Sequence, residues 1–394
     1  MTDIDDPFRS YQKMRLAGPA VYDQAVDKWF VVGDDAARHV LTSDDFPVVD
    51  AARMDECSPG WRESSGDAHR YSLLPFTNPP AHTRIRRLIT RDLTVRKVEA
   101  LRPLIEREAD RALDALAEHG RDGAPADFLR LVAYPVTVAV IAALVGVPAE
   151  DWRSFRSWSD DLVAMQDPRI SPEAKAQADA AAKEFNDYVL ALIAERHRQP
   201  RNDLISDYLA VQSNDPDQLT DTELLHSILI LVLAGYVTTA DSLGNAVHAL
   251  LSHPEQFKRL HQEPSLIGGV VDETLRWAAP VQIVQRYAAR DIRLDGRQIP
   301  GGSTVLVMLG AANRDSARCP YADEFDIERD AGYGLAFGAG VHFCLGMALA
   351  KLELTTVLGR FAERFPNATF ASPPVRRNTT GLAGFASLEL TIND

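Results

Sequence analysis

A cysteine within a glycine-rich segment is the feature of this sequence best suited to redox chemistry. Cys344 lies in the run Phe337-Gly-Ala-Gly-Val-His-Phe-Cys-Leu-Gly346, directly before a segment with helical character. Its glycines, Gly338, Gly340 and Gly346, allow tight turns and the close approach of a flat partner. The free amides at the start of a helix stabilise an anion, so this cysteine can bind iron as a thiolate. The alternative is a buried core thiol, the common state of a lone cysteine.

The same segment resembles the heme-binding signature of the cytochrome P450 family. The matching positions are Phe337, Gly340, His342, Cys344, Gly346 and Ala350. The resemblance implies that Cys344 is the axial ligand of the iron in heme b, iron protoporphyrin IX, and that Phe337, Gly338 and Gly346 shape the loop around it. A thiolate ligand pushes electron density onto the iron and favours cleavage of the O–O bond.

A long helix is predicted from Thr220 to Ser252, where Thr220 and Glu223 fit a capping box and a proline follows the end. Its centre is apolar on all sides, which predicts a helix that crosses the protein interior. Gly235 costs about 1 kcal/mol relative to alanine there. The hydroxyl of Thr238 either bonds back to the preceding turn or serves a function.

In the family that this helix resembles, an Ala-Gly-x-acid-Thr pattern crosses the heme, and the threonine helps to deliver protons to bound oxygen. Ala234, Gly235 and Thr238 match that pattern, whereas Val237 stands in place of the acid. Valine can neither bind nor relay a proton. Asp241, one helical turn later, could organise a water chain or simply pack, and polar groups of the substrate could also supply protons.

Two charged residues, Glu273 and Arg276, are three positions apart and share one face of a short predicted helix. Such pairs are common on surfaces. Here the pair resembles the Glu-x-x-Arg motif of the family, which implies that it joins Arg329 and supports the loop that carries Cys344. The predicted role is structural.

Cations for the two heme propionates are predicted in two places. His82 and Arg86 are four residues apart and therefore share a helical face. By resemblance they bind the propionates together with Arg286 and His342; the alternative is an exposed basic face. Gly334 replaces a histidine that the family commonly places before the cysteine loop.

The substrate pocket is expected, by resemblance, to be lined mainly by apolar side chains, as suits an organic ligand held by burial. The predicted lining residues are Leu233, Val237, Ile283, Val284 and Phe385.

Composition agrees with one large domain spanning residues 1–394, because no linker interrupts a chain that is 46% hydrophobic. Three scattered cysteines suit neither a disulfide framework nor a zinc site. The net charge of −14 argues against general binding to nucleic acid or to an anionic membrane. The acidic N-terminus lacks the features of a signal peptide, and no segment reaches about 18 apolar residues, so we expect a cytoplasmic protein.

The expected fold is mainly α with a small β sheet, the fold of the P450 family, with heme between the long central helix and the helix after the cysteine loop. Strands are predicted at Val21–Tyr22 and Trp29–Val32, and again at Ile283–Tyr287, Ile292–Leu294 and Thr304–Met308. A helix is predicted from Asp34 to Leu41, and helices dominate from about Pro79 to Pro264.

The predicted function is a bacterial heme-thiolate monooxygenase that inserts one oxygen atom from O2 into a small organic substrate, in secondary metabolism such as antibiotic biosynthesis. The chain contains no flavin, nicotinamide or iron–sulfur fingerprint, so a separate ferredoxin and ferredoxin reductase must supply electrons. Two alternatives stay open. One is a non-hydroxylating oxidation, namely desaturation, phenol coupling or rearrangement, with substrate-assisted proton delivery; the other is a heme-based sensor or binding protein.

Overall fold

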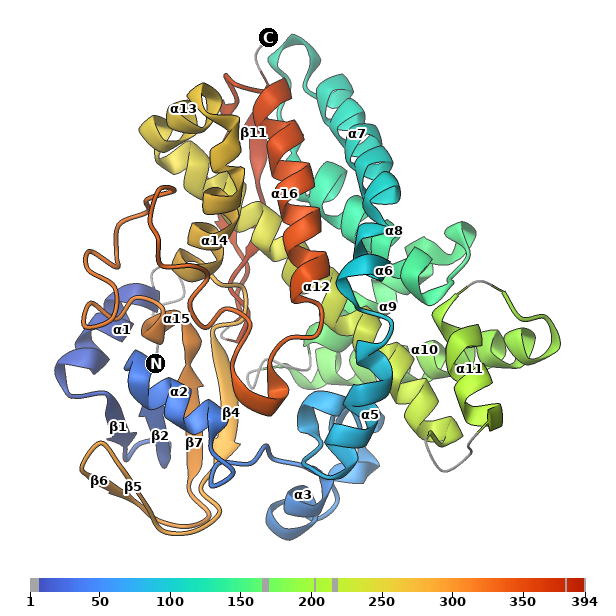
Figure 1. Cartoon of the computed structure of the whole chain (residues 1–394), viewed down its shortest axis with the longest axis vertical. Coiled ribbons are helices and arrows are strands. Elements are labelled where there is room, and N and C mark those ends of the chain that lie inside the picture. Colours follow the sequence, from blue (N-terminus) through green and yellow to red (C-terminus); the bar gives the residue numbers. More distant parts are fainter. Residues whose placement is uncertain (1–6, 165–169, 202, 215–218, 380, 393–394) are drawn as a thin grey trace. The chain divides into compact units, whose positions relative to one another are not determined.

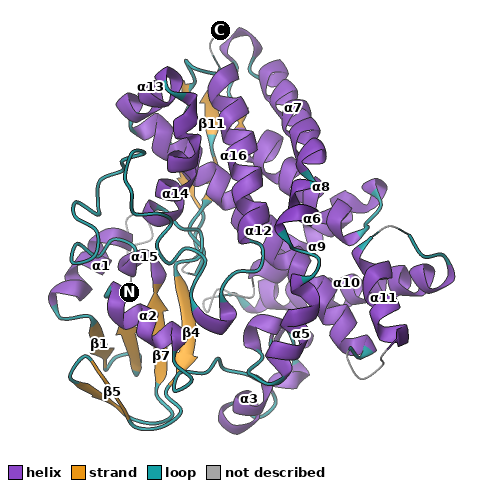
Figure 2. Ribbon diagram, viewed as in Figure 1, coloured by secondary structure: helices purple, strands orange, loops and turns teal. Residues whose placement is uncertain are grey.

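The computed structural model describes residues 7–164, 170–201, 203–214, 219–379 and 381–392, and helices dominate it (Figure 2). The chain forms two compact units. The first unit comprises Met1–Pro47, Arg102–Val136 and Thr238–Asp394, and the second comprises Val48–Leu101 and Thr137–Val237. Helices α8 (Tyr134–Val145) and α12 (Asp221–Ser252) pass from one unit into the other. The prediction of a mainly helical chain with a small sheet is confirmed.

The remaining helices of the first unit are α1 (Pro7–Leu16), α2 (Asp34–Thr42), α7 (Arg102–His119), α13 (Pro254–Gln262), α14 (Ile267–Trp277), α15 (Leu309–Ala312) and α16 (Met347–Arg364). Its strands are β1 (Ala20–Asp23), β2 (Lys28–Val31), β3 (Ala126–Asp127), β4 (Ile283–Tyr287), β5 (Ile292–Leu294), β6 (Arg297–Ile299), β7 (Thr304–Met308), β8 (Thr369–Phe370), β9 (Val375–Arg376), β10 (Phe385–Ser387) and β11 (Glu389–Thr391). The second unit contributes α3 (Ala51–Cys57), α4 (Ser65–Arg70), α5 (Ala81–Thr90), α6 (Val95–Glu99), α9 (Trp152–Ala164), α10 (Pro172–Arg198) and α11 (Leu204–Asn214).

The main sheet joins strands from the two ends of the chain in the order β1-β2-β7-β4 (Figure 1). β1 and β2 form an antiparallel hairpin. β2 then pairs in parallel with β7, in a register that places Trp29 opposite Val305. β4 closes the sheet antiparallel to β7, with Ile283 opposite Met308. The predicted sheet is therefore confirmed, whereas the short pairings of β3, β8, β9, β10 and β11 were not predicted.

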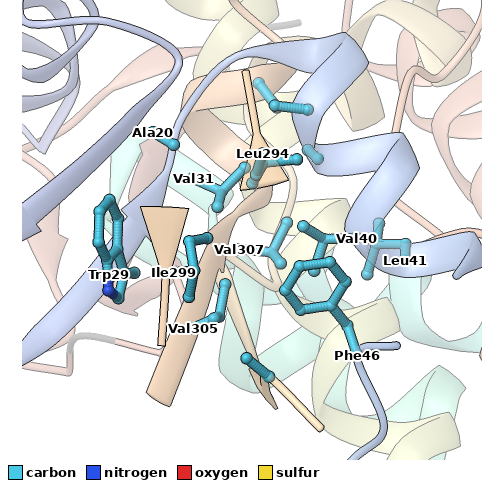
Figure 3. Close-up of a cluster of buried hydrophobic side chains, with 14 of the residues drawn as sticks. Ala20, Trp29, Val31, Val40, Leu41, Phe46, Leu294, Ile299, Val305 and Val307 are labelled. Carbon is cyan, nitrogen blue, oxygen red and sulfur yellow. The ribbon is translucent and has the colours of Figure 1, made fainter. Parts of the chain in front are cut away.

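Alternate residues of these strands face two different hydrophobic clusters, as the two-residue period of a strand requires. Val31, Val305 and Val307 pack with α2 residues such as Val40 in one cluster (Figure 3). Leu306 and Met308 point the other way. They meet Tyr11 of α1 in the second cluster. Helices α1 and α2 thus cover opposite faces of the sheet.

Helix α12 begins with the predicted capping box. The amide of Thr220 donates to the Glu223 carboxylate at 2.9 Å, and the amide of Glu223 donates to the Thr220 hydroxyl at 3.2 Å. Among the described helices, α12 alone is long and apolar enough by composition to cross a membrane, contrary to the expectation from its sequence. Within its most apolar window, 56% of the residues are buried. A core helix of a globular protein passes the same test, so this finding carries little weight.

Candidate active site

The loop that carries Cys344 is closed by its own backbone. The amide of Cys344 donates to the carbonyl of Phe337 at 2.9 Å, and that of Phe343 donates to Gly340 at 3.0 Å. Cys344 itself is exposed. Helix α16 begins three residues later, at Met347, with Gly346 as its N-cap. A reachable sulfur close to a helix start is the arrangement that the sequence predicted.

Two loop glycines adopt backbone conformations that other residues rarely adopt. Gly338 has φ of 70° and Gly340 has φ of 71°. A β-carbon on Gly340 would collide with the carbonyl of Leu41 in α2, while one on Gly338 would meet nothing within 4 Å. Gly340 is therefore required for close packing against α2, and Gly338 for the turn and an open face.

A buried ion-pair network lies behind this loop. Arg276 Nε and Nη2 donate to the two carboxylate oxygens of Glu273 at 2.7 and 2.8 Å, and both side chains are only 2% exposed. Arg329 Nε also donates to Glu273, at 3.2 Å. The three residues that the sequence grouped together are in contact.

The network reaches the loop through Asn313, which the sequence did not single out. Arg276 Nη1 donates to the carbonyl of Asn313 at 3.0 Å, and the side-chain oxygen of Asn313 accepts from the amide of Leu335. Leu335 in turn accepts from the amide of Gly338 at 2.9 Å. A β-carbon on Gly334 would collide with Asn313, so a histidine would not fit there without displacing this link. No local sequence signal marks Asn313, because its partners are remote in the chain.

Arg286 on β4 is a buried cation of a different kind. It is 6% exposed, and its Nη1 donates to the carbonyl of Gln285 at 2.8 Å. No ion pair is found for it among the residues that the structure describes. Burial lowers the pKa of Arg286 to about 10. A buried guanidinium in this state is suited to an anionic ligand such as a carboxylate.

In the second unit, His82 and Arg86 lie one turn apart on α5. His82 is buried and Arg86 is half-buried. Burial, together with the charge of Arg86, lowers the pKa of His82 to about 4. At neutral pH Arg86 therefore carries the charge of this pair, while the neutral imidazole can still donate a hydrogen bond.

The predicted oxygen-handling residues lie in the middle of α12. Ala234 is exposed and Thr238, one turn on, is half-buried, whereas Leu233 and Val237 are buried. A β-carbon on Gly235 would lie 2.7 Å from the Cδ1 atom of Ile141 in α8. Helix packing therefore accounts for this glycine, and the same helix presents Ala234 and Thr238 on a less covered face.

The carboxylate of Asp241 forms an ion pair with an arginine. Arg377 Nη2 and Nη1 donate to its two carboxylate oxygens at 2.7 and 3.0 Å. Arg377 was missed by sequence reasoning because 136 positions separate it from Asp241. Of the roles left open for Asp241, the observed contacts favour packing.

Three of the residues predicted to line a pocket have identified packing partners in the protein. Ile283 lies against the cluster around Tyr11, and Val284 lies against the opposite cluster, which contains Val305. Phe385 is buried and packs against His248, with ring centroids 4.7 Å apart. Their role in binding a substrate stays a prediction.

Comparisons with known proteins show that these features belong to one protein family. A family model described as Cytochrome P450 matches residues 30–389. Cytochrome P450 monooxygenase PikC of Streptomyces venezuelae is 37% identical over 381 residues, covering 94% of this chain and 86% of PikC. The 6-deoxyerythronolide B hydroxylase of Saccharopolyspora erythraea is 34% identical over 369 residues, covering 92% of this chain and 89% of the hydroxylase. A crystal structure of P450BioI in complex with an acyl carrier protein ligated to hexadec-9Z-enoic acid superposes with a TM-score of 0.91 at 30% identity, covering 98% of each chain.

The chain belongs to the cytochrome P450 family. Its fold is that of the family, it is a monooxygenase, and its cofactor is heme. The described residues fit that cofactor, because Cys344 presents an exposed thiol on a glycine loop and Arg286 is a buried cation suited to a propionate.

Proposed function

We propose that this P450 inserts one oxygen atom from O2 into a small organic substrate in bacterial secondary metabolism, with heme b held through Cys344. The exposed thiol of Cys344, on a loop fixed by Gly340 and by the Arg276 network, is the observation that carries this proposal. Bound heme would supply a thiolate-ligated iron at which O2 is activated.

The residues around the cofactor have distinct tasks in this proposal. Arg286, Arg86, His82 and His342 bind the propionates. Phe337, Gly338 and Gly346 shape the loop so that it can approach the porphyrin closely. Glu273, Arg276 and Arg329 keep that loop in place. Thr238 would hold a proton for the oxygen chemistry that heme supplies, and Ala234 would leave room beside it, whereas Gly235 packs against Ile141 of α8.

Substrate class is inferred from the relatives and from the apolar character of the predicted pocket. The names of the relatives PikC and 6-deoxyerythronolide B hydroxylase indicate enzymes of secondary metabolism. The predicted lining residues Leu233, Val237, Ile283, Val284 and Phe385 are apolar, which suits an organic substrate held mainly by burial. We propose such a substrate, used in a pathway such as antibiotic biosynthesis.

Electrons are proposed to come from a ferredoxin with its reductase, in the cytoplasm and away from membranes and nucleic acid. Exposed or half-buried cations such as Arg84, Arg87 and Lys351 are candidates for docking an acidic ferredoxin. Arg84 is paired with Glu223, and Lys351 with Asp272 at 2.6 Å. Arg87 is exposed. We also propose that residues 1–394 form a single domain.

A second outcome is favoured by one observation on proton supply. Val237 is buried where the family pattern has an acid, and both oxygens of Asp241 accept from Arg377. Neither residue is then placed to hold a transferable proton. Substrate polar groups would supply it, and desaturation, phenol coupling or rearrangement becomes the alternative to hydroxylation.

The first experiment is the absorption spectrum of the reduced protein with carbon monoxide. A thiolate opposite CO shifts the Soret band strongly to the red, so wild type should show that band and Cys344→Ala should not. A wild-type band like that of histidine-ligated heme would contradict the role of Cys344. Oxygen uptake with a surrogate ferredoxin, coupled to product, would separate this enzyme from a sensor.

A further inference from the structure

Three polar side chains follow Thr238 along one face of α12. Asp241, Asn245 and His248 are spaced by four and three residues, so they lie above one another on the helix. Asp241 is 1% exposed and Asn245 is 3% exposed, while His248 is half-buried. We call these three residues the α12 stripe. Buried polar groups of this kind need specific partners.

Asp241 holds Arg377, which stands just before the residues Gly381–Gly384, here called the C-terminal turn. Besides its two bonds to Asp241, Arg377 Nη2 donates to the Tyr134 hydroxyl at 2.9 Å. Burial acts against the charge of Arg377, but Asp241 and Tyr134 together raise its pKa above the ordinary value. A β-carbon on Gly384 would collide with the Asp241 carboxylate, so the backbone of the turn lies directly against this acid.

The other two members of the stripe hold the same turn. Asn245 Nδ2 donates to the carbonyl of Ala383 at 3.1 Å and to that of Ala278 at 2.9 Å. The ring of His248 packs in a tilted arrangement against Phe385, which follows the turn, with an interplanar angle of 32°. The stripe therefore contacts the turn at Ala383 and Gly384 and contacts Phe385 directly after it, and Asn245 also bonds to Ala278 at the end of α14.

The C-terminal turn in turn pairs with the segment that leads into β4. The amide of Ala383 donates to the carbonyl of Pro280 at 2.7 Å, and the amide of Gln282 donates to Gly381 at 3.0 Å. β4 begins at Ile283 and carries Arg286. A continuous set of contacts thus connects the helical turn after Thr238 with the strand that bears the buried cation.

This inference rests on the proposed function. We propose that Asp241 and Asn245 are positioning residues that hold the C-terminal turn beside α12. Held in this way, the turn limits the space for the organic substrate next to Thr238. Asp241 acts through Arg377, and Asn245 acts through the carbonyl of Ala383. Asp241 and Asn245 therefore determine, through the turn, which ligands fit beside Thr238.

Two azoles of different size test this proposal on the ferric holoprotein. Imidazole needs only the iron, whereas 4-phenylimidazole also needs room beside it, and both can be titrated by the shift of the Soret band. Asp241→Asn and Arg377→Gln should each change 4-phenylimidazole affinity by about fivefold or more and imidazole affinity by less than about twofold. The double variant should show no more than the larger single effect, because both changes break one contact.

Asp114→Asn is the matched control, since it breaks an exposed pair with Arg364 in the same unit. It should leave both affinities unchanged. If Asp241→Asn yields no holoprotein, Asn245→Ala carries the test, because it leaves no charge unpaired, and the same size-dependent change is expected.

Equal affinities for both azoles in all variants would overturn the proposal. So would an equal loss for both azoles, which would mean general damage, or a solvent isotope effect on oxygen uptake that changes in Asp241→Asn while azole affinities do not. Failure of the proposed function is recognised separately, because wild type would then lack the red-shifted carbon monoxide band.

Discussion

Two buried arginines of the first unit, Arg276 and Arg286, show how differently the same charge can be accommodated. Arg276 is bonded to both oxygens of Glu273 and to three backbone carbonyls. Arg286 is bonded to the carbonyl of its neighbour Gln285, and burial lowers its pKa to about 10.

The difference separates an arginine that holds the protein together from one that is suited to hold a ligand. A buried charge with complete partners within the chain is costly to disturb. A buried charge without a counter-ion among the described residues lowers the stability of the fold until an anion binds beside it. The two classes can be told apart by measuring stability without heme and heme retention separately.

Arg276→Ala should have the largest effect on the protein without heme. It leaves Glu273 with only Arg329 as a cationic partner, and breaking a buried pair costs about 3–5 kcal/mol in the free energy of unfolding. Denaturant unfolding of the apoprotein measures this loss. Recovery of holoprotein with normal stability would refute the structural role of Arg276.

His248 adds a third case to the comparison: a base that burial keeps neutral because its pKa is lowered. Burial first, and then the charges of Arg376 and His253, lower its pKa to about 4. An unfolded histidine binds a proton near pH 6.5, whereas the folded one does not until about pH 4. The contribution of His248 to stability should therefore be constant above pH 6.5 and fall by on the order of 2–3 kcal/mol as pH drops to 4.

Unfolding measured across that pH range in wild type and in His248→Phe tests this expectation. The phenylalanine keeps the ring contact with Phe385 but cannot bind a proton, so the slope should become shallower. An identical slope in both proteins would show that other groups cause the acid loss.

Arg286→Gln should behave in the opposite way to Arg276→Ala. The free energy of unfolding of the apoprotein should stay within about 1 kcal/mol of wild type or rise, because an unbalanced buried charge is removed. Heme transfer to an acceptor protein should become about tenfold faster or more, since a charge-assisted hydrogen bond contributes about 1.5–3 kcal/mol. Arg286→Lys keeps the charge and should retain heme better than Arg286→Gln.

Tyr11→Phe should give the smallest effect, as a neutral counterpart to the charged cases. The Tyr11 hydroxyl donates to Gln282 Oε1 at 3.1 Å in a buried site. Its loss should lower the free energy of unfolding by about 1 kcal/mol without changing the carbon monoxide spectrum. A much larger loss would mean that α1 depends on this one bond.

Local patterns were enough to predict the cysteine loop, the capping box of α12 and the strands of the main sheet. In each case the signal lies within a few residues: glycines around Cys344, Thr220 with Glu223, or alternating apolar side chains. Arg329 is remote from Glu273 and Arg276 in the sequence, so the network of these three residues was predicted only through the family resemblance.

Contacts between distant segments could not be predicted in the same way. Asn313 and Arg377 look like ordinary polar residues in the sequence, and their importance comes from carbonyls and carboxylates that folding brings near. The sequence showed only that Gly235 matches the family pattern at a cost in helix stability, whereas Ile141 of α8 explains why a side chain does not fit there. Periodicity gives the face of a helix but not what lies against it.

The main sheet also has a consequence for the order in which the chain folds during synthesis. β2 completes its pairing only with β7, the amide of Asp34 reaches the carboxylate of Asp315, 281 positions later, and Tyr11 reaches Gln282, 271 positions later. At about 5–20 residues per second, the N-terminal hairpin leaves the ribosome roughly 15–60 s before these partners exist. During that interval β2 is an exposed strand edge, and we expect chaperones that bind nascent chains to protect this segment.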